Sequence, residues 1–155
     1  QSYVSKVQFQ FRNLPLTTIH RNAFVGARAA EAADIQGKFW EMHNLLYQKQ
    51  DPNGQTGWVA SQDPLNDYFV GFAEQLKLDV DKFKTDFAST TVNDRINADI
   101  AAFKETGEQQ ATPTFFLNGK KIDNGELLEQ NEAGQAVPSY DKFSAMLDKA
   151  LADNK

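Results

Sequence analysis

The side chains that could do chemistry in this sequence are two histidines, His20 and His43, and a set of scattered carboxylates. The chain contains no cysteine, which excludes disulfides, thiolate metal sites and cysteine nucleophiles within these residues. His43 shares a helical stripe with Phe39 and Leu46, and His20 lies in a strand-to-helix connection, so both are expected to be structural. Two histidines without a third ligand make a poor zinc site. We therefore predict no catalytic residue, no metal site and no cofactor.

Other candidate motifs do not fit the spacing that their chemistry needs. Asp51-Pro52-Asn53-Gly54 is similar to the start of a calcium loop, but the glycine comes too early and no glutamate closes the loop. No nucleophile elbow, phosphate loop or dinucleotide fingerprint is present. The remaining carboxylates are expected on solvated faces and helix caps: Glu31, Glu41, Glu74, Asp79 and Asp81.

Phe39, Trp40 and Met42 are candidates for lining a substrate groove. Their helical spacing favours a place in the core instead. Aromatic residues make up 12% of the chain, which suits a tightly filled helical layer.

Length and composition indicate one compact globular domain. The chain has 155 residues, of which 41% are apolar and 24% charged. The net charge is -5 and no basic cluster stands out, so no nucleic-acid partner is expected. No apolar run approaches the ~20 residues that span a bilayer, and association with a membrane surface stays open. No signal peptide is visible, so we expect a chain that is cytosolic, mature or cut from something longer.

The first part of the chain predicts a strand followed by two helices. Residues 4–12 alternate apolar and polar side chains, which is typical of a half-buried strand near a sheet edge. Helical spacing begins near Asn22 with a slim face of small residues, and Gly37 interrupts it. A second helix is expected over residues 38–50, and residues 51–61 are expected to form a loop.

Cap signals mark the later helices. Asp63 begins one helix ahead of a proline, Asp79 caps a short one, and Ser89 or Thr90 caps the next. Ser139 caps the last helix. Apolar residues follow each cap at helical spacing: Leu65, Phe69, Phe72 and Leu76; Phe83 and Phe87; Val92, Ile96, Ile100 and Phe103; Phe143 and Leu147.

A hairpin is predicted between the last two helices. Thr114 to Leu117 reads as a strand buried on both faces, and Asn118-Gly119 is a strong two-residue turn signal. Residues 123–137 are polar and turn-rich. The order strand, helices, hairpin, helix suggests α/β layers, although this sheet is thin for so many helices.

Several segments together resemble one family. Residues 111–120, read as ATPTFFLNGK, closely resemble the cis-proline strand and hairpin of thioredoxin-fold proteins. Residues 11–16 and 20–33 resemble the strand and following helix of DsbA-like proteins, and residues 37–43 resemble that family's next helix. The helices over residues 64–104 correspond to the family's helical insertion. The resemblance covers most of the chain in family order.

The resemblance implies a thioredoxin-like α/β fold with a helical insertion. Residues 1–155 would be a single, incomplete domain with its insertion at about 38–106. The family's first strand and the helix that begins with Cys-X-X-Cys are missing before Val7. The resemblance also implies a cis Thr112–Pro113 bond, with an ordinary trans proline as the alternative, and substrate contacts from Thr112 and Pro113. Ala111 departs from the family, because a glycine is common there.

The function that this resemblance implies is protein thiol–disulfide exchange on extracytoplasmic proteins. A cytoplasmic location stays open. Exchange requires a thiolate, so the chain is expected to be inert by itself. It would be part of a disulfide oxidoreductase, or alternatively a non-catalytic module that binds protein or peptide partners at the cis-proline face.

The missing strand leaves a predicted gap in the sheet. In the thioredoxin arrangement it lies between the strand at Val7 to Phe11 and the strand at Thr114 to Leu117, and unpaired edges invite another strand. Another chain or segment is expected to fill the slot, giving a strand-swapped or strand-completed assembly. Direct pairing of the two strands is the second expectation.

Overall fold

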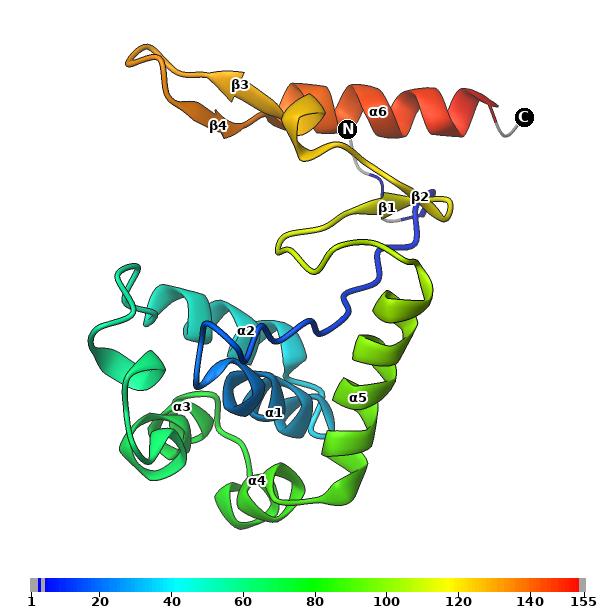
Figure 1. The fold of residues 1–155 in the computed structure, drawn as a ribbon. Helices are drawn as coiled ribbons and strands as arrows, with labels where there is room; N and C mark the ends of the chain where they lie inside the picture. The colour runs from blue at the N-terminus through cyan, green and yellow to red at the C-terminus, as the bar shows by residue number, and fades with distance from the viewer. Residues whose placement is uncertain (1–2, 4, 154–155) are drawn as a thin grey trace. The chain divides into compact units, whose positions relative to one another are not determined.

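The computed structural model describes residues 3 and 5–153, which group into two compact units (Figure 1). The helical unit is Phe11–Gln110, and the sheet unit combines Gln1–Gln10 with Ala111–Lys155. Both ends of the chain therefore contribute to the sheet unit. The predicted helical insertion, residues 38–106, lies within the helical unit.

The elements of the helical unit follow the predicted cap signals. The Asp79 carboxylate accepts a hydrogen bond from the Lys82 amide at 2.9 Å, and the Ser89 hydroxyl accepts one from the Val92 amide at 3.2 Å. Ser89, rather than Thr90, is thus the cap. The elements are α1 (Ala23–Asp34), α2 (Phe39–Gln48), the 3₁₀ turn η1 (Gly57–Val59), the π turn η2 (Leu65–Phe69), α3 (Val70–Gln75), α4 (Val80–Phe87) and α5 (Thr90–Glu105).

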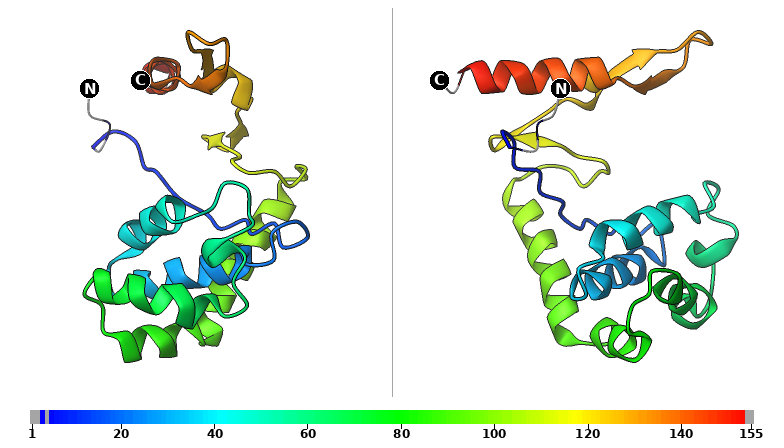
Figure 2. Two further views of the ribbon diagram at one scale, coloured as in Figure 1. Left: turned by 90° about the vertical axis from the view of Figure 1, so that its left-hand side faces the viewer. Right: turned by 180° about the vertical axis from the view of Figure 1, so that it is seen from behind.

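Helix α1 lies at the centre of the helical unit, in contact with α2, α4 and α5 (Figures 1 and 2). Its slim face was expected from the sequence, and the structure buries Gly26 and four alanines on it. The buried Trp58 ring crosses this face so closely that a Cβ on Gly26 would lie 2.9 Å from its Cζ3 atom. Small residues on α1 therefore let the surrounding helices approach its backbone.

Large apolar side chains fill the rest of the helical unit. Met42, Phe69 and Phe83 are fully buried, as their helical spacing predicted. Trp40 differs, because it is 45% exposed although its spacing favoured the core. The core cluster consists of Ala29, Ala30, Ala32, Ala33, Met42, Leu45, Leu46, Trp58, Phe69, Phe72, Ala73, Phe83 and Phe87.

The sheet unit holds two short hairpins and the last helix. Asn118 and Gly119 have positive φ angles of 50° and 78°, which is the predicted hairpin turn. The Ser139 hydroxyl accepts from the Lys142 amide at 3.3 Å and caps the last helix. The elements are β1 (Phe116–Leu117), β2 (Lys120–Lys121), the 3₁₀ turn η3 (Asn124–Leu127), β3 (Leu128–Gln130), β4 (Ala136–Pro138) and α6 (Tyr140–Asp153).

The two ends of the chain are hydrogen-bonded within this unit. The Tyr3 hydroxyl lies 3.1 Å from the Ser144 carbonyl oxygen and 3.1 Å from the Asp148 Oδ1 atom, both on α6. The Phe115 and Phe143 rings meet edge to face with centroids 6.3 Å apart. These contacts join the first residues and the β1 hairpin to α6.

Two sequence-based expectations about strands are wrong. The described part of residues 4–12 holds no strand, because alternating side chains alone do not fix a strand. Thr114 to Leu117 is not buried on both faces: only its last two residues are strand, and Phe116 is 39% exposed. The polar, turn-rich residues 123–137 contain η3 and most of the β3–β4 hairpin, which was not predicted from the sequence.

The described sheets are consequently thin. They are two antiparallel pairs, β1 with β2 and β3 with β4, and neither described sheet includes residues 7–11. The thioredoxin-like expectation of α/β layers thus meets a largely helical chain with few short strands.

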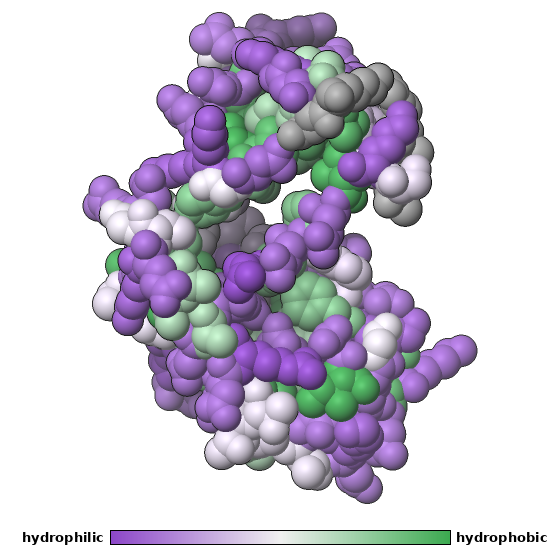
Figure 3. Space-filling model, turned by 90° about the vertical axis from the view of Figure 1, so that its right-hand side faces the viewer, coloured by the Kyte–Doolittle hydropathy of each residue, from purple (hydrophilic) through white to green (hydrophobic). Residues whose placement is uncertain are grey.

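Hydrophobic side chains interrupt the hydrophilic surface over both units (Figure 3). Among the residues that the structure describes, no helix is both long and apolar enough to span a bilayer.

Candidate functional site

The predicted site residues Thr112 and Pro113 lie in an exposed loop directly before β1. The bond between them is cis, the form that the resemblance implies. The carbonyl groups of the residues on either side of Thr112 each accept a hydrogen bond from a side chain. The Thr114 hydroxyl donates to the Ala111 carbonyl at 2.6 Å, and the Asn124 amide donates to the Pro113 carbonyl at 2.6 Å.

Between these two bonded residues, Thr112 keeps its backbone groups available for hydrogen bonding. It is exposed and makes no hydrogen bond to any described residue, so its backbone N–H and C=O face solvent or a partner. Its neighbours are already bonded within the chain. A backbone donor and acceptor held in this way can pair with an extended peptide, as an edge strand does. Peptide binding at Thr112 and Pro113 stays a prediction.

Asn124 is a site residue that sequence reasoning missed, because it lies in a segment, residues 123–137, that was described only as polar and turn-rich. It is the first residue of η3, eleven positions after Pro113. Its side chain reaches back to the loop across the β1–β2 hairpin. The one signal available was Asp123-Asn124-Gly125, a local turn pattern that does not reveal a distant contact.

The two histidines are in different settings. His20 is exposed, and its carbonyl accepts from the Ala23 amide in the turn before α1. His43 is partly buried on α2 in an aromatic cluster, with ring centroids 4.8 Å from Tyr47 and 5.2 Å from Phe11. Within the described residues, no three side chains of the metal-binding types come together. The contacts of His43 with the Tyr47 and Phe11 rings support the prediction that His43 is a structural residue.

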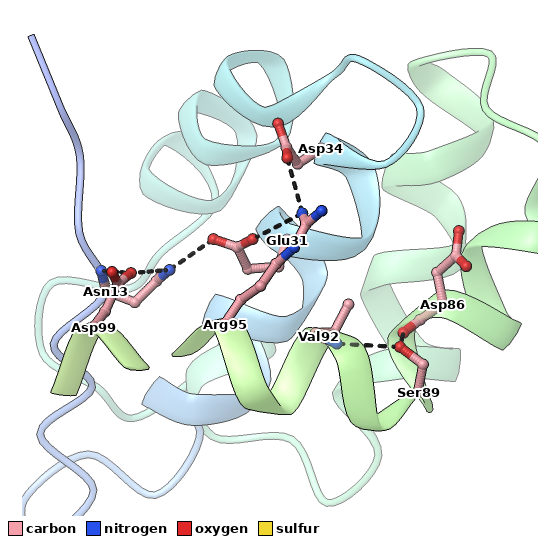
Figure 4. A network of polar contacts seen from close by, with 8 residues as sticks. All are labelled: Asn13, Glu31, Asp34, Asp86, Ser89, Val92, Arg95 and Asp99. Carbon is pink, nitrogen blue, oxygen red and sulfur yellow. Dashed lines mark hydrogen bonds and ion pairs between the residues drawn. The ribbon is translucent and has the colours of Figure 1, made fainter. Parts of the chain in front are cut away.

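A polar network joins the segment before α1 to α1 and α5 (Figure 4). The buried Asn13 amide group donates to the Glu31 Oε1 atom at 2.8 Å and to the Asp99 Oδ2 atom at 3.2 Å. The Asn13 backbone N–H also donates to that Asp99 oxygen at 2.8 Å. Arg95 then bonds Glu31 and Asp34 at 3.4 Å and 3.0 Å.

Glu31 therefore does not lie on a solvated face, as its sequence pattern suggested. Its side chain is only 12% exposed and has two partners from other elements. Each carboxylate in the network accepts a hydrogen bond from an amide or guanidinium group, and none of these contacts pairs an acid with a base that could exchange protons at a substrate. The network is structural.

Glu41 lies on a solvated face, as predicted, and Asp51 closes a turn. Lys38 donates to Glu41 at 2.7 Å on the surface, and this hydrogen bond lowers the pKa of the Glu41 carboxyl. The Asp51 carboxylate accepts from the backbone of Asn53 at 3.0 Å and from Thr56, and these bonds lower the pKa of Asp51. Asp51 thus closes the loop over its own backbone amides, which is an Asx-type turn.

Most of the chain is similar in sequence to known proteins. A family model described as thioredoxin matches residues 2–149. The Na(+)/H(+) antiporter NhaA 1 of Salinispora arenicola is 39% identical over 125 residues, which cover 81% of this chain and 17% of that protein. The Na(+)/H(+) antiporter NhaA 3 of Salinispora tropica is 39% identical over 118 residues, covering 76% and 16%.

A third relative is the Na(+)/H(+) antiporter NhaA of Herminiimonas arsenicoxydans, 31% identical over 143 residues that cover 86% of this chain and 21% of that protein. The chain thus spans only 16–21% of the length of these relatives. No solved structure matches it.

Proposed function

Because the chain belongs to the DsbA-like branch of the thioredoxin family, we propose that it is the polypeptide-binding part of a protein thiol–disulfide oxidoreductase. The observation that carries the proposal is the open backbone of Thr112 between two carbonyls that the chain has already bonded. An extended substrate segment pairs with the Thr112 N–H and C=O and lies along Pro113. Backbone pairing makes this binding tolerant of substrate sequence.

The chain contributes no thiol to the exchange, since it has no cysteine. A Cys-X-X-Cys disulfide outside these 155 residues is the oxidant. A substrate thiolate attacks that disulfide and forms a mixed disulfide, and the second substrate thiolate then displaces the enzyme sulfur. The substrate dithiol loses two electrons and two protons, and the cysteine pair is reduced to two thiols. We place this reaction outside the cytoplasm, where disulfides persist.

A second candidate function is a non-catalytic peptide-binding module. It is favoured by the absence of cysteine and by relatives whose names describe antiporters rather than oxidoreductases. The two candidates share the Thr112 site. A Cys-X-X-Cys encoded shortly before Gln1 would favour the oxidoreductase, and a start codon there would favour the module.

Binding is tested by adding a capped, cysteine-free hexapeptide of alternating serine and valine to the ¹⁵N-labelled chain. We expect the Thr112 amide resonance to shift in proportion to occupancy. The matched control is the same peptide with its central amides N-methylated, which keeps the side chains but cannot donate. It should bind about 3–10-fold more weakly, because the hydrogen bond that the peptide donates to the Thr112 carbonyl is lost. Equal binding by both peptides, or no shift at Thr112, would refute the proposal.

The assignment of the chemistry is tested separately. The chain alone is expected to show no insulin reduction and no dithiol oxidation above the uncatalysed rate, because the attacking thiolate is absent. Turnover by the cysteine-free chain would contradict it.

A further inference from the structure

We infer that Asn124 is a positioning residue that sets the affinity of the Thr112 backbone for an extended peptide; this inference rests on the proposed function. The Asn124 Nδ2 atom lies 2.6 Å from the Pro113 carbonyl oxygen, which is a short hydrogen bond for an amide donor. This hydrogen bond connects the segment that follows the β1–β2 hairpin to the loop that contains Thr112 and Pro113. Asn124 itself is exposed and lies outside the apolar core.

The turn that carries Asn124 is fixed at both ends. At its start, the Asp123 carboxylate accepts from the Gly125 amide at 2.9 Å. At its end, Leu127 is buried and its carbonyl accepts from the Ser139 amide at 2.8 Å, directly before α6. Asn124 therefore connects the Pro113 carbonyl to a turn that α6 anchors.

The hydrogen bonds around the loop explain why this matters for binding. The Thr114 hydroxyl occupies the Ala111 carbonyl, and Asn124 occupies the Pro113 carbonyl. Of these three consecutive carbonyls, that of Thr112 is left for a partner. Fixing both neighbours orders the Thr112 backbone before a peptide arrives, so binding loses less conformational entropy. Without Asn124, the Pro113 carbonyl becomes a competing acceptor and the loop moves more.

The test compares Asn124→Asp with Asn131→Asp. At neutral pH an aspartate at 124 can only accept hydrogen bonds and repels the Pro113 carbonyl. Asn131 closes the β3–β4 loop by accepting from the Ala133 and Gln135 backbone amides, a role that a carboxylate keeps. Its amide group also donates to the Gln135 Oε1 atom at 3.2 Å, and in the variant the Gln135 side chain can turn to donate to the carboxylate instead. The two variants therefore make the same charge change in the same unit, and one of them leaves the Thr112 loop untouched.

We expect Asn124→Asp to bind the serine–valine hexapeptide about 3–10-fold more weakly than the natural chain at pH 7, the effect of one net hydrogen bond. Asn131→Asp should bind within about twofold of the natural chain. Below pH ~4 the protonated carboxylic acid at 124 can donate to the Pro113 carbonyl, so the affinity should recover. This recovery is a result that general damage to the fold would not produce.

A measurement without peptide keeps the inference separate from the proposed function. In Asn124→Ala the ¹⁵N relaxation order parameter of Thr112 should fall toward the range of flexible backbone, below about 0.6. An order parameter equal to that of the natural chain would overturn the inference even if the peptide binds. Failure of the natural chain to bind, with the order parameter lowered as expected, would overturn only the proposed function. Equal binding by Asn124→Asp and Asn131→Asp at pH 7 would also overturn the inference.

Discussion

Replacing Asn13 by alanine should destabilise the helical unit by about 2 kcal/mol. The change removes the side-chain bonds of 2.8 Å to Glu31 and 3.2 Å to Asp99. A hydrogen bond to a charged group contributes about 1.5–3 kcal/mol. The Asp99 bond adds little, because the same oxygen keeps the Asn13 backbone N–H at 2.8 Å. Glu31 keeps Arg95, so its charge is not left unpaired.

Urea unfolding followed by tryptophan fluorescence measures this loss in the helical unit alone. Both tryptophans of the chain, Trp40 and Trp58, lie in that unit. The matched control is Asn66→Ala, which also removes a side-chain bond to a carboxylate, 2.7 Å to Asp63, and also keeps the backbone N–H bond. Asn66 is exposed, so its loss should stay within about 0.5 kcal/mol. Equal losses at the two asparagines would refute the argument that burial gives the network its strength.

Two other predictions concern packing and pH. Gly26→Ala should lower the free energy of unfolding by about 1–3 kcal/mol, because the new Cβ would lie 2.9 Å from the Trp58 ring. Gly71→Ala, with open space around the new Cβ, should raise that free energy by up to about 1 kcal/mol. Equal effects of the two substitutions in urea unfolding would contradict the packing argument. The hydrogen bond from the Asn53 amide lowers the pKa of Asp51 in the folded chain. The ionised Asp51 therefore stabilises the loop fully above its unfolded-state pKa of ~3.9. This stabilisation is lost as the pH falls through the lower folded-state pKa of Asp51. The Asn53 amide resonance should accordingly titrate with a midpoint below ~3.9, and a midpoint above it would show that the bond does not form.

Features decided within a few residues could be predicted from the sequence. Asp79, Ser89 and Ser139 cap helices because each side-chain oxygen reaches an amide three residues ahead. Asn118-Gly119 makes its turn because both residues tolerate a positive φ. The burial of α1 followed from its small residues.

Features decided by distant partners could not be predicted in the same way. The alternation in residues 4–12 is that of a strand, yet a strand also needs a neighbour, and no described sheet includes this segment. Trp40 has the spacing of a core residue, but spacing does not tell the rim of a helix stripe from its centre.

The residues of the candidate site also differ in whether local sequence or a distant contact identifies them. Thr112 and Pro113 were found through a motif, whereas Asn124 depends on a contact that crosses a hairpin. The β3–β4 hairpin was missed although Asn131 and Gly134 mark its turn, because each of its strands has only 3 residues, too few to show an alternating pattern.

The Tyr3–Ser144 hydrogen bond has a consequence for the order of folding. Its two residues are 141 positions apart, whereas the helical unit between them is one continuous segment. During synthesis that segment is made before α6, so its helices can pack first. Prior packing shortens the effective loop that must close when Tyr3 meets α6, and closure entropy falls with it. A substitution that slows folding of the helical unit should therefore also delay assembly of the Thr112 loop, although the two share no catalytic chemistry.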